Sequence, residues 1–121
     1  MNKKIKKKWV KALRSGEYVQ GRQYLCVPKG EYDEFCCLGV LCDLIARDKD
    51  SKSPSWRRKR VFRYMADDLI VLAFGYKHDT PTEAFRRKVG LDKDEQDELI
   101  EMNDNQNRSF KEIADYIEVN L

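Results

Sequence analysis

The sequence lacks the long apolar segments that mark membrane-spanning and secreted proteins. Its longest apolar run, Leu69 to Phe74, is far shorter than the roughly 20 residues that cross a bilayer. The basic start over residues 1–8 is not followed by the apolar stretch of a secretory signal. The sequence therefore predicts a soluble protein of the cytoplasm with no membrane partner.

Histidine is nearly absent, and glycine-rich phosphate loops are missing. The one histidine, His78, stands beside Asp79 with no motif that places a nucleophile near it. No glycine pattern of the Walker or dinucleotide-binding type occurs. The many acidic residues over 92–104 are interpreted as one solvated helix face. The sequence therefore predicts a binding protein without a cofactor, and not an enzyme.

Cysteine is present, but its spacing gives little support to a metal site. Only Cys37 and Cys42 have a spacing that zinc sites use, and apolar residues surround them. Zinc at this pair is the alternative to reduced thiols that pack in the core as small hydrophobes, which we favour. We expect no metal. The four cysteines are Cys26, Cys36, Cys37 and Cys42.

The length of 121 residues fits one domain, predicted over residues 1–121 with the polar segment 48–55 as a flexible loop. Charged residues make up 37% of the chain, against about 25% in average domains. Residues 1–90 carry 21 Lys and Arg and 11 Asp and Glu, whereas residues 91–121 carry 3 and 10. Two interpretations stay open: the acidic end packs against the basic body, or a basic surface attracts phosphates.

The first third predicts a helix followed by extended chain. Apolar residues at helical spacing predict a helix over 3–15 that ends at a left-handed Gly16. Its lysine face is interpreted as solvated, with nucleic-acid or membrane binding as the alternative. Residues 18–27 predict an extended segment with a bulge or a close backbone approach at Gly21, and a short partner strand is expected around residues 32–36.

The rest of the chain predicts further helices. Residues 36–47 predict a buried central helix in which Gly39 lets another backbone approach, with a strand as the competitor. Residues 61–74 fit a helix and a strand equally. Capping signals predict helices over 81–89, from Asp92 to a break at residues 103–105, and from Ser109 onward. The predicted fold is α+β, a mostly helical small single domain with a short antiparallel β-hairpin.

Ten polar and aromatic residues are candidates for ligand binding. Arginine forks suit phosphates, aromatic rings stack on bases, and amides or carboxylates match base edges or ribose hydroxyls. The alternative is that the aromatics are core, the arginines solvated, and the Asn and Asp residues turn the chain. The candidates are Arg14, Arg22, Arg57 and Arg60 for phosphates, Tyr18, Tyr24 and Trp56 for bases, and Gln20, Asn103 and Asp104 for base edges.

Several sequence blocks together resemble a widespread family of small bacteriophage and prophage proteins. They cover both ends and the middle of the chain, whereas residues 48–90 depart from the family pattern. The blocks are Trp9, Ala12-Leu13-Arg14-Ser15-Gly16-Glu17-Tyr18 with Gln20, Cys36-Cys37-Leu38-Gly39-Val40-Leu41-Cys42-Asp43, Asn103-Asp104, Ser109-Phe110 and Ile113-Ala114-Asp115-Tyr116-Ile117-Glu118.

The chain is also similar to the anti-CBASS sponge family of phages, which sequesters cyclic dinucleotides. This resemblance implies an anti-defence protein of the host cytoplasm that binds a cyclic nucleotide without cleaving it. A symmetric ligand held across a two-fold interface would make the protein a homodimer. The alternatives are a phage protein that inhibits a host protein by direct contact, through the acidic face over 92–104, and a nucleic-acid-binding regulator.

Overall fold

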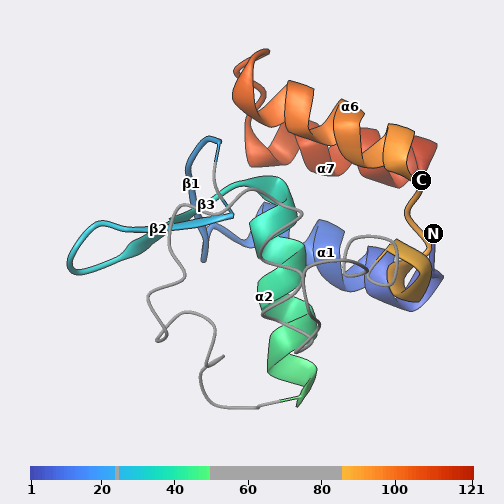
Figure 1. Cartoon of the computed structure of the whole chain (residues 1–121), viewed down its shortest axis with the longest axis horizontal. Helices are drawn as coiled ribbons and strands as arrows, with labels where there is room; N and C mark the ends of the chain where they lie inside the picture. The colour runs from blue at the N-terminus through green and yellow to red at the C-terminus, as the bar shows by residue number, and fades with distance from the viewer. Residues whose placement is uncertain (24, 50–85) are drawn as a thin grey trace.

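The structure, a computed structural model, describes residues 1–23, 25–49 and 86–121. In Figure 1, α6 and α7 lie side by side, α2 stands across α1, and the sheet lies at the end of the molecule away from both chain termini. This architecture is the predicted α+β fold, mostly helical. The elements are α1 (Lys3–Ser15), β1 (Val19–Gln20), β2 (Cys26–Pro28), β3 (Asp33–Phe35), α2 (Cys37–Lys49), α6 (Lys93–Asp104) and α7 (Phe110–Asn120).

Helix α1 has the predicted bounds, and local capping explains them. The side chain of Asn2 accepts hydrogen bonds from the N–H groups of Lys4 and Ile5, both at 3.0 Å, so two otherwise unsatisfied donors are paired. Gly16 ends the helix with φ 78°, a left-handed conformation that glycine adopts without steric penalty.

The sheet has the order β1-β3-β2. β2 and β3 are antiparallel, with Cys26 opposite Phe35, and β1 runs parallel to β3. The antiparallel pair was predicted, but the parallel β1 was not. The predicted close approach at Gly21 is confirmed, because a Cβ there would lie 2.8 Å from the Cβ of Glu34.

Helix α2 is the predicted buried centre. Leu41 is fully buried, and a Cβ on Gly39 would lie 1.9 Å from the carbonyl oxygen of Leu25, so the predicted close approach is confirmed. The helix continues to Lys49, two residues beyond the prediction. The first two residues of the loop predicted over 48–55 therefore belong to α2, and its remaining residues lie outside the described part of the chain.

The helix predicted over 81–89 is described only at its end. Residues 86–89 are helical, and Gly90 ends them with φ 74°. The N–H groups of Gly90 and Leu91 both donate to the carbonyl of Arg86, at 2.7 and 2.9 Å. The start of this helix, and the undecided segment 61–74, lie outside the described residues.

The last two helices begin at the predicted residues, and each begins with a capping box. Asp92 with Glu95 starts α6, and Ser109 with Glu112 starts α7; in each pair both reciprocal hydrogen bonds are present. The prediction that residues 103–105 break the helix is wrong by two residues. Asn103 and Asp104 form the last turn of α6, and Asn105 is its C-cap.

The core lies between α1, α2 and α7, with α6 and the sheet closing its sides. Helix α1 packs most extensively against α7, so the acidic end of the chain does pack against its basic start. No helix in the described ranges is both long and apolar enough to cross a membrane. The largest fully buried side chains are Trp9, Leu25, Leu41, Leu99, Ile113, Ile117, Val40, Val89 and Asn103.

Candidate ligand-binding site

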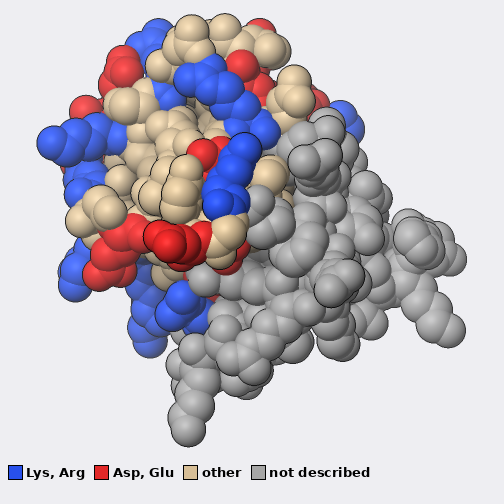
Figure 2. All heavy atoms as spheres, turned by 90° about the vertical axis from the view of Figure 1, so that its left-hand side faces the viewer, with Lys and Arg blue, Asp and Glu red and all other residues tan. Residues whose placement is uncertain are grey.

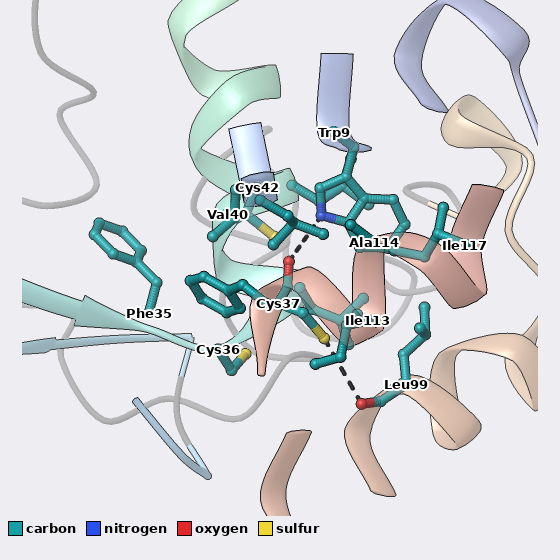
Figure 3. Close-up of a cluster of buried hydrophobic side chains, with 14 of the residues drawn as sticks. Trp9, Phe35, Cys36, Cys37, Val40, Cys42, Leu99, Ile113, Ala114 and Ile117 are labelled. Carbon is teal, nitrogen blue, oxygen red and sulfur yellow. Dashed lines mark hydrogen bonds between the residues drawn. The ribbon is translucent and has the colours of Figure 1, made fainter. Parts of the chain in front are cut away.

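The Cys36-Cys37 pair forms the start of α2. Cys36 is the residue before the helix, and its Sγ accepts the N–H of Gly39 at 3.4 Å, in the manner of a capping side chain. The carbonyl of Cys37 accepts the indole N–H of Trp9 at 2.9 Å, and the thiol of Cys37 donates to the carbonyl of Leu99 at 3.6 Å (Figure 3). Cys37 therefore joins the start of α2 to α1 and to α6.

Asn103, one of the predicted base-reading residues, is fully buried and uses its whole hydrogen-bonding capacity within the protein. Its Oδ1 accepts from the side chain of Gln20 at 3.0 Å and from the N–H of Cys37 at 3.2 Å. Its Nδ2 donates to the carbonyl of Gly21 and to the carboxylate of Asp104, both at 2.9 Å. Because Cys37 is the first residue of α2, Asn103 caps that helix from the end of α6.

Gln20 extends this network to α7. Its Nε2 also donates to the carbonyl of Arg108 at 2.8 Å, and its Oε1 accepts from the N–H of Phe110, the first residue of α7, at 3.1 Å. The sequence grouped Gln20 with Asn103, and the structure brings them together. A ligand could reach their polar atoms only by displacing bonds that hold two helix starts.

Asp104 and Arg22 also contact protein groups. The carboxylate of Asp104 accepts from the N–H of Gln23 at 2.9 Å, and the guanidinium of Arg22 donates to the side chain of Asn107. The hollow beside Asp104, Asn103 and Cys36 has a volume of only about 20 Å³, enough for about one water molecule. This part of the predicted site has no room for a nucleotide.

Tyr18 lies apart from the network around Asn103 and contacts a buried carboxylate. Its hydroxyl donates to Asp43 at 2.6 Å, and the guanidinium of Arg47 donates to the same oxygen at 2.9 Å. Burial acts to lower the pKa of Arg47, but the hydrogen bond and charge of Asp43 outweigh it, and the net shift is upward. The ring of Tyr18 stands edge-on to Phe35, with 5.0 Å between centroids.

Arg14 is held by two carboxylates of α7. Its guanidinium nitrogens lie 2.7 Å from Glu118 and 2.7 Å from Asp115. These hydrogen bonds, from Glu118 first and Asp115 second, raise the pKa of Arg14. Of the ten candidate residues, Tyr24, Trp56, Arg57 and Arg60 lie outside the described part of the chain.

An open groove of about 780 Å³ runs along α1 beside Arg14. Its volume falls within the roughly 300–1,000 Å³ of small-molecule sites. Its described lining has five cations and one carboxylate. None of its four lysines forms an ion pair within residues 1–23, 25–49 and 86–121. The lining residues are Lys3, Lys6, Lys7, Val10, Lys11, Arg14, Ser15 and Glu118.

The groove lysines were not among the ten candidates, although their spacing signals one face. Lys3, Lys7 and Lys11 recur every fourth residue, which places them on one side of a helix, and Lys6 lies beside them. That this side lines a groove is not evident from the sequence, because Glu118, which also lines the groove, comes from the other end of the chain. We call Lys3, Lys6, Lys7 and Lys11 the groove lysines.

All four cysteines are buried, and none is in a disulfide bond. Burial, the largest cause, raises the pKa of Cys36 to about 12, and it raises the pKa values of Cys37 and Cys42. In the described ranges no group of three or more potential ligands could hold a metal ion. The prediction of metal-free thiols stays a prediction.

We expect the four thiols to resist an aromatic disulfide reagent in the native protein at pH 8 and to react after denaturation, because all four are buried and burial suppresses the reactive thiolate of Cys36, Cys37 and Cys42. The pKa of Cys36 in the folded protein lies above its unfolded value of about 9. The preference of the folded protein for the neutral thiol therefore contributes stability that is complete below pH 9. That stability is lost as pH rises toward about 12, the pKa of Cys36. The measurement is thiol release against time, with and without urea. Rapid stoichiometric reaction of the native protein would contradict the expected burial.

The chain has no match among curated proteins or among solved structures. A family model does match it, over residues 1–121. The chain therefore belongs to the family described as Domain of unknown function (DUF8296).

Proposed function

We propose that the protein binds and sequesters a phosphate-bearing small molecule in the groove along α1, without turning it over. The observation that supports this most is the five cations along one side of the groove. From Lys3 to Arg14 they span roughly 16 Å of helix at 1.5 Å per residue. Such a row raises the local concentration of anions.

The cations of the groove differ in mobility. Arg14 is fixed by Asp115 and Glu118, so part of its charge is neutralised at that end. The groove lysines carry three donors each on flexible stems and bind phosphates as point charges. Val10 lies among them and is 6% exposed, so it forms an apolar part of the groove floor. Charge at the sides and an apolar floor suit a ligand with phosphates and flat rings.

The finer proposal is that the ligand is a cyclic di- or trinucleotide and that the protein is a phage anti-defence sponge of the host cytoplasm. It rests on the resemblance to the anti-CBASS sponges together with the cation row. The base-stacking roles of Tyr24 and Trp56, and phosphate binding by Arg57 and Arg60, remain predictions. A homodimer that holds a symmetric ligand across its two-fold axis belongs to the same proposal.

Calorimetry with a panel of cyclic di- and trinucleotides tests the proposal. We expect submicromolar binding, about −8 kcal/mol or better, to one of them. Reversing two groove lysines, Lys7→Glu with Lys11→Glu, removes two attractive charges and adds two repulsive ones, so affinity should fall by about 100-fold or more. The matched control reverses Lys4 on the same helix and Lys111 on α7, which do not line the groove, and should change affinity by less than about threefold.

Three results would contradict parts of this proposal. Cleaved nucleotide after heat release would make the protein an enzyme. Equal losses in the groove and control variants would remove the groove as the site. Binding of duplex or single-stranded nucleic acid but of no cyclic nucleotide, with an affinity that falls by about one counterion per phosphate contact as salt rises, would favour the nucleic-acid-binding regulator.

A further inference from the structure

A second hollow, of about 400 Å³, lies on another part of the surface, between the sheet, the end of α1 and α2. It shares no lining residue with the groove. Its lining combines apolar side chains with three carboxylates. Its lining includes Glu17, Val19, Glu31, Tyr32, Leu44 and Arg47, and we call it the sheet hollow.

Exposed apolar side chains are concentrated at the sheet hollow. In the described ranges only three large hydrophobic side chains are exposed, and two of them, Val19 at 44% and Tyr32 at 49%, line it. Single exposed apolar residues are common on soluble proteins, whereas a group of them in a concave surface is typical of an interaction site. The group indicates a partner with apolar side chains.

The charge around the sheet hollow is opposite to that of the whole chain. The chain carries a net +3, yet the described lining of the hollow has three carboxylates, those of Glu17, Glu31 and Asp33, and one cation. That cation, Arg47, donates to the fully buried Asp43. Figure 2 shows the face with the outer end of the sheet, where both acidic and basic side chains border an uncharged area. The hollow therefore favours a partner with positive charge.

The floor of the sheet hollow is preformed. The hydroxyl of Tyr18 donates to Asp43, and its ring packs edge-on against Phe35, so its position is fixed from two directions. Arg47 is fixed from α2 by the same carboxylate. A surface that is ordered before binding loses less conformational entropy when a partner docks.

We propose that the sheet hollow docks a short segment of another protein in which lysine or arginine alternates with apolar residues. The cationic side chains of the segment pair with Glu17 and Glu31, and its apolar side chains pack on Val19 and Tyr32. This proposal is independent of nucleotide binding in the groove. One alternative function was inhibition of a host protein by direct contact through the acidic face over 92–104. The proposal places such a contact at the sheet hollow instead.

The probe is an acetylated and amidated pentapeptide that alternates lysine with valine, titrated into ¹⁵N-labelled full-length protein. We expect binding near 0.1 mM, about −5.5 kcal/mol. The shifted resonances should include those of Val19, Tyr32 and Leu44. Glu31→Lys should weaken binding by about tenfold, because it turns an attraction into a repulsion. Glu98→Lys, the same charge change on the exposed face of α6, should have less than a twofold effect.

The controls separate this proposal from its competitors. A lysine–glycine pentapeptide should bind at least about fivefold more weakly, because it lacks apolar side chains. Equal binding of both peptides, shifts confined to other elements, or no binding would each overturn the proposal. Self-association that Glu31→Lys abolishes, and that excludes the peptide, would assign the hollow to the lysine-rich α1 of a second copy and would also overturn it.

Discussion

Replacing Asn103 with alanine should destabilise the protein by about 3–5 kcal/mol, because four hydrogen bonds inside the core are lost at once. The N–H of Cys37 and the carbonyl of Gly21 are main-chain groups that cannot turn away to find other partners. A buried polar group left without a partner costs about 1–3 kcal/mol. Domains of this size have about 5–15 kcal/mol of total stability, so the variant should be near the limit of folding.

Urea denaturation followed by circular dichroism measures this effect. Asn105→Ala is the matched control, because Asn105 is exposed and its side chain bonds only to Glu101 among the contacts seen here. We expect it to change the free energy of unfolding by less than about 0.5 kcal/mol. Similar losses in the two variants would show that the network around Asn103 contributes little.

Asn103→Asp tests the direction of the hydrogen bonds. The variant keeps the shape and the acceptor for Cys37 and Gln20, but it replaces the donor that faces the carbonyl of Gly21 and the carboxylate of Asp104. At neutral pH it should be nearly as unstable as the alanine variant, because an oxygen now faces two oxygens. Lowering the pH toward 4 should recover part of the difference, since a protonated carboxyl donates one hydrogen bond.

Replacing Gly39 with alanine should destabilise the protein by about 3 kcal/mol or more, against the usual trend for a helix. Alanine inside a helix is normally favoured over glycine by roughly 1 kcal/mol. Here the new Cβ would lie 1.9 Å from the carbonyl oxygen and 2.7 Å from the carbonyl carbon of Leu25. The clash is with main chain, so α2 and the segment that leads into β2 would have to separate.

Gly16→Ala is the matched comparison for Gly39→Ala. Among the residues that the structure describes, nothing lies within 4 Å of a Cβ at Gly16, so its left-handed φ of 78° is what opposes the substitution. The loss should be about 1–2 kcal/mol. Thermal unfolding of both variants checks the order. A Gly39→Ala protein as stable as the natural one would mean that Leu25 can move away without loss.

The residues behind the family resemblance are largely those that hold the fold. Trp9 and Asn103 both bond to the main chain of Cys37, and Gln20 joins Asn103 to the start of α7. None of these three lines the groove or the sheet hollow. Six other residues of the resembling blocks do line these surfaces: Arg14, Ser15 and Glu118 line the groove, and Ala12, Glu17 and Tyr18 line the sheet hollow. The two surfaces proposed for binding involve mainly lysines, glutamates and exposed apolar residues.

The sequence by itself determined the elements whose signals are local. The bounds of α1 and the starts of α6 and α7 depend on capping groups within three residues of the helix end, such as Asn2, Asp92 and Ser109. The close approaches at Gly21 and Gly39 were predictable for a related reason: a missing side chain in an otherwise regular element indicates a near neighbour. The sequence position of each glycine did not reveal which residue would be its neighbour.

Only the tertiary structure decided which surfaces are available to a ligand. Gln20 and Asn103 look like base-reading groups in the sequence, but they are 83 residues apart and bond to each other once the chain folds. Arg14 meets the carboxylates of Asp115 and Glu118 for the same reason, over more than 100 residues. Capping depends on adjacent residues, whereas the partner of a polar side chain depends on the packing of whole helices. Composition and spacing cannot reveal that packing.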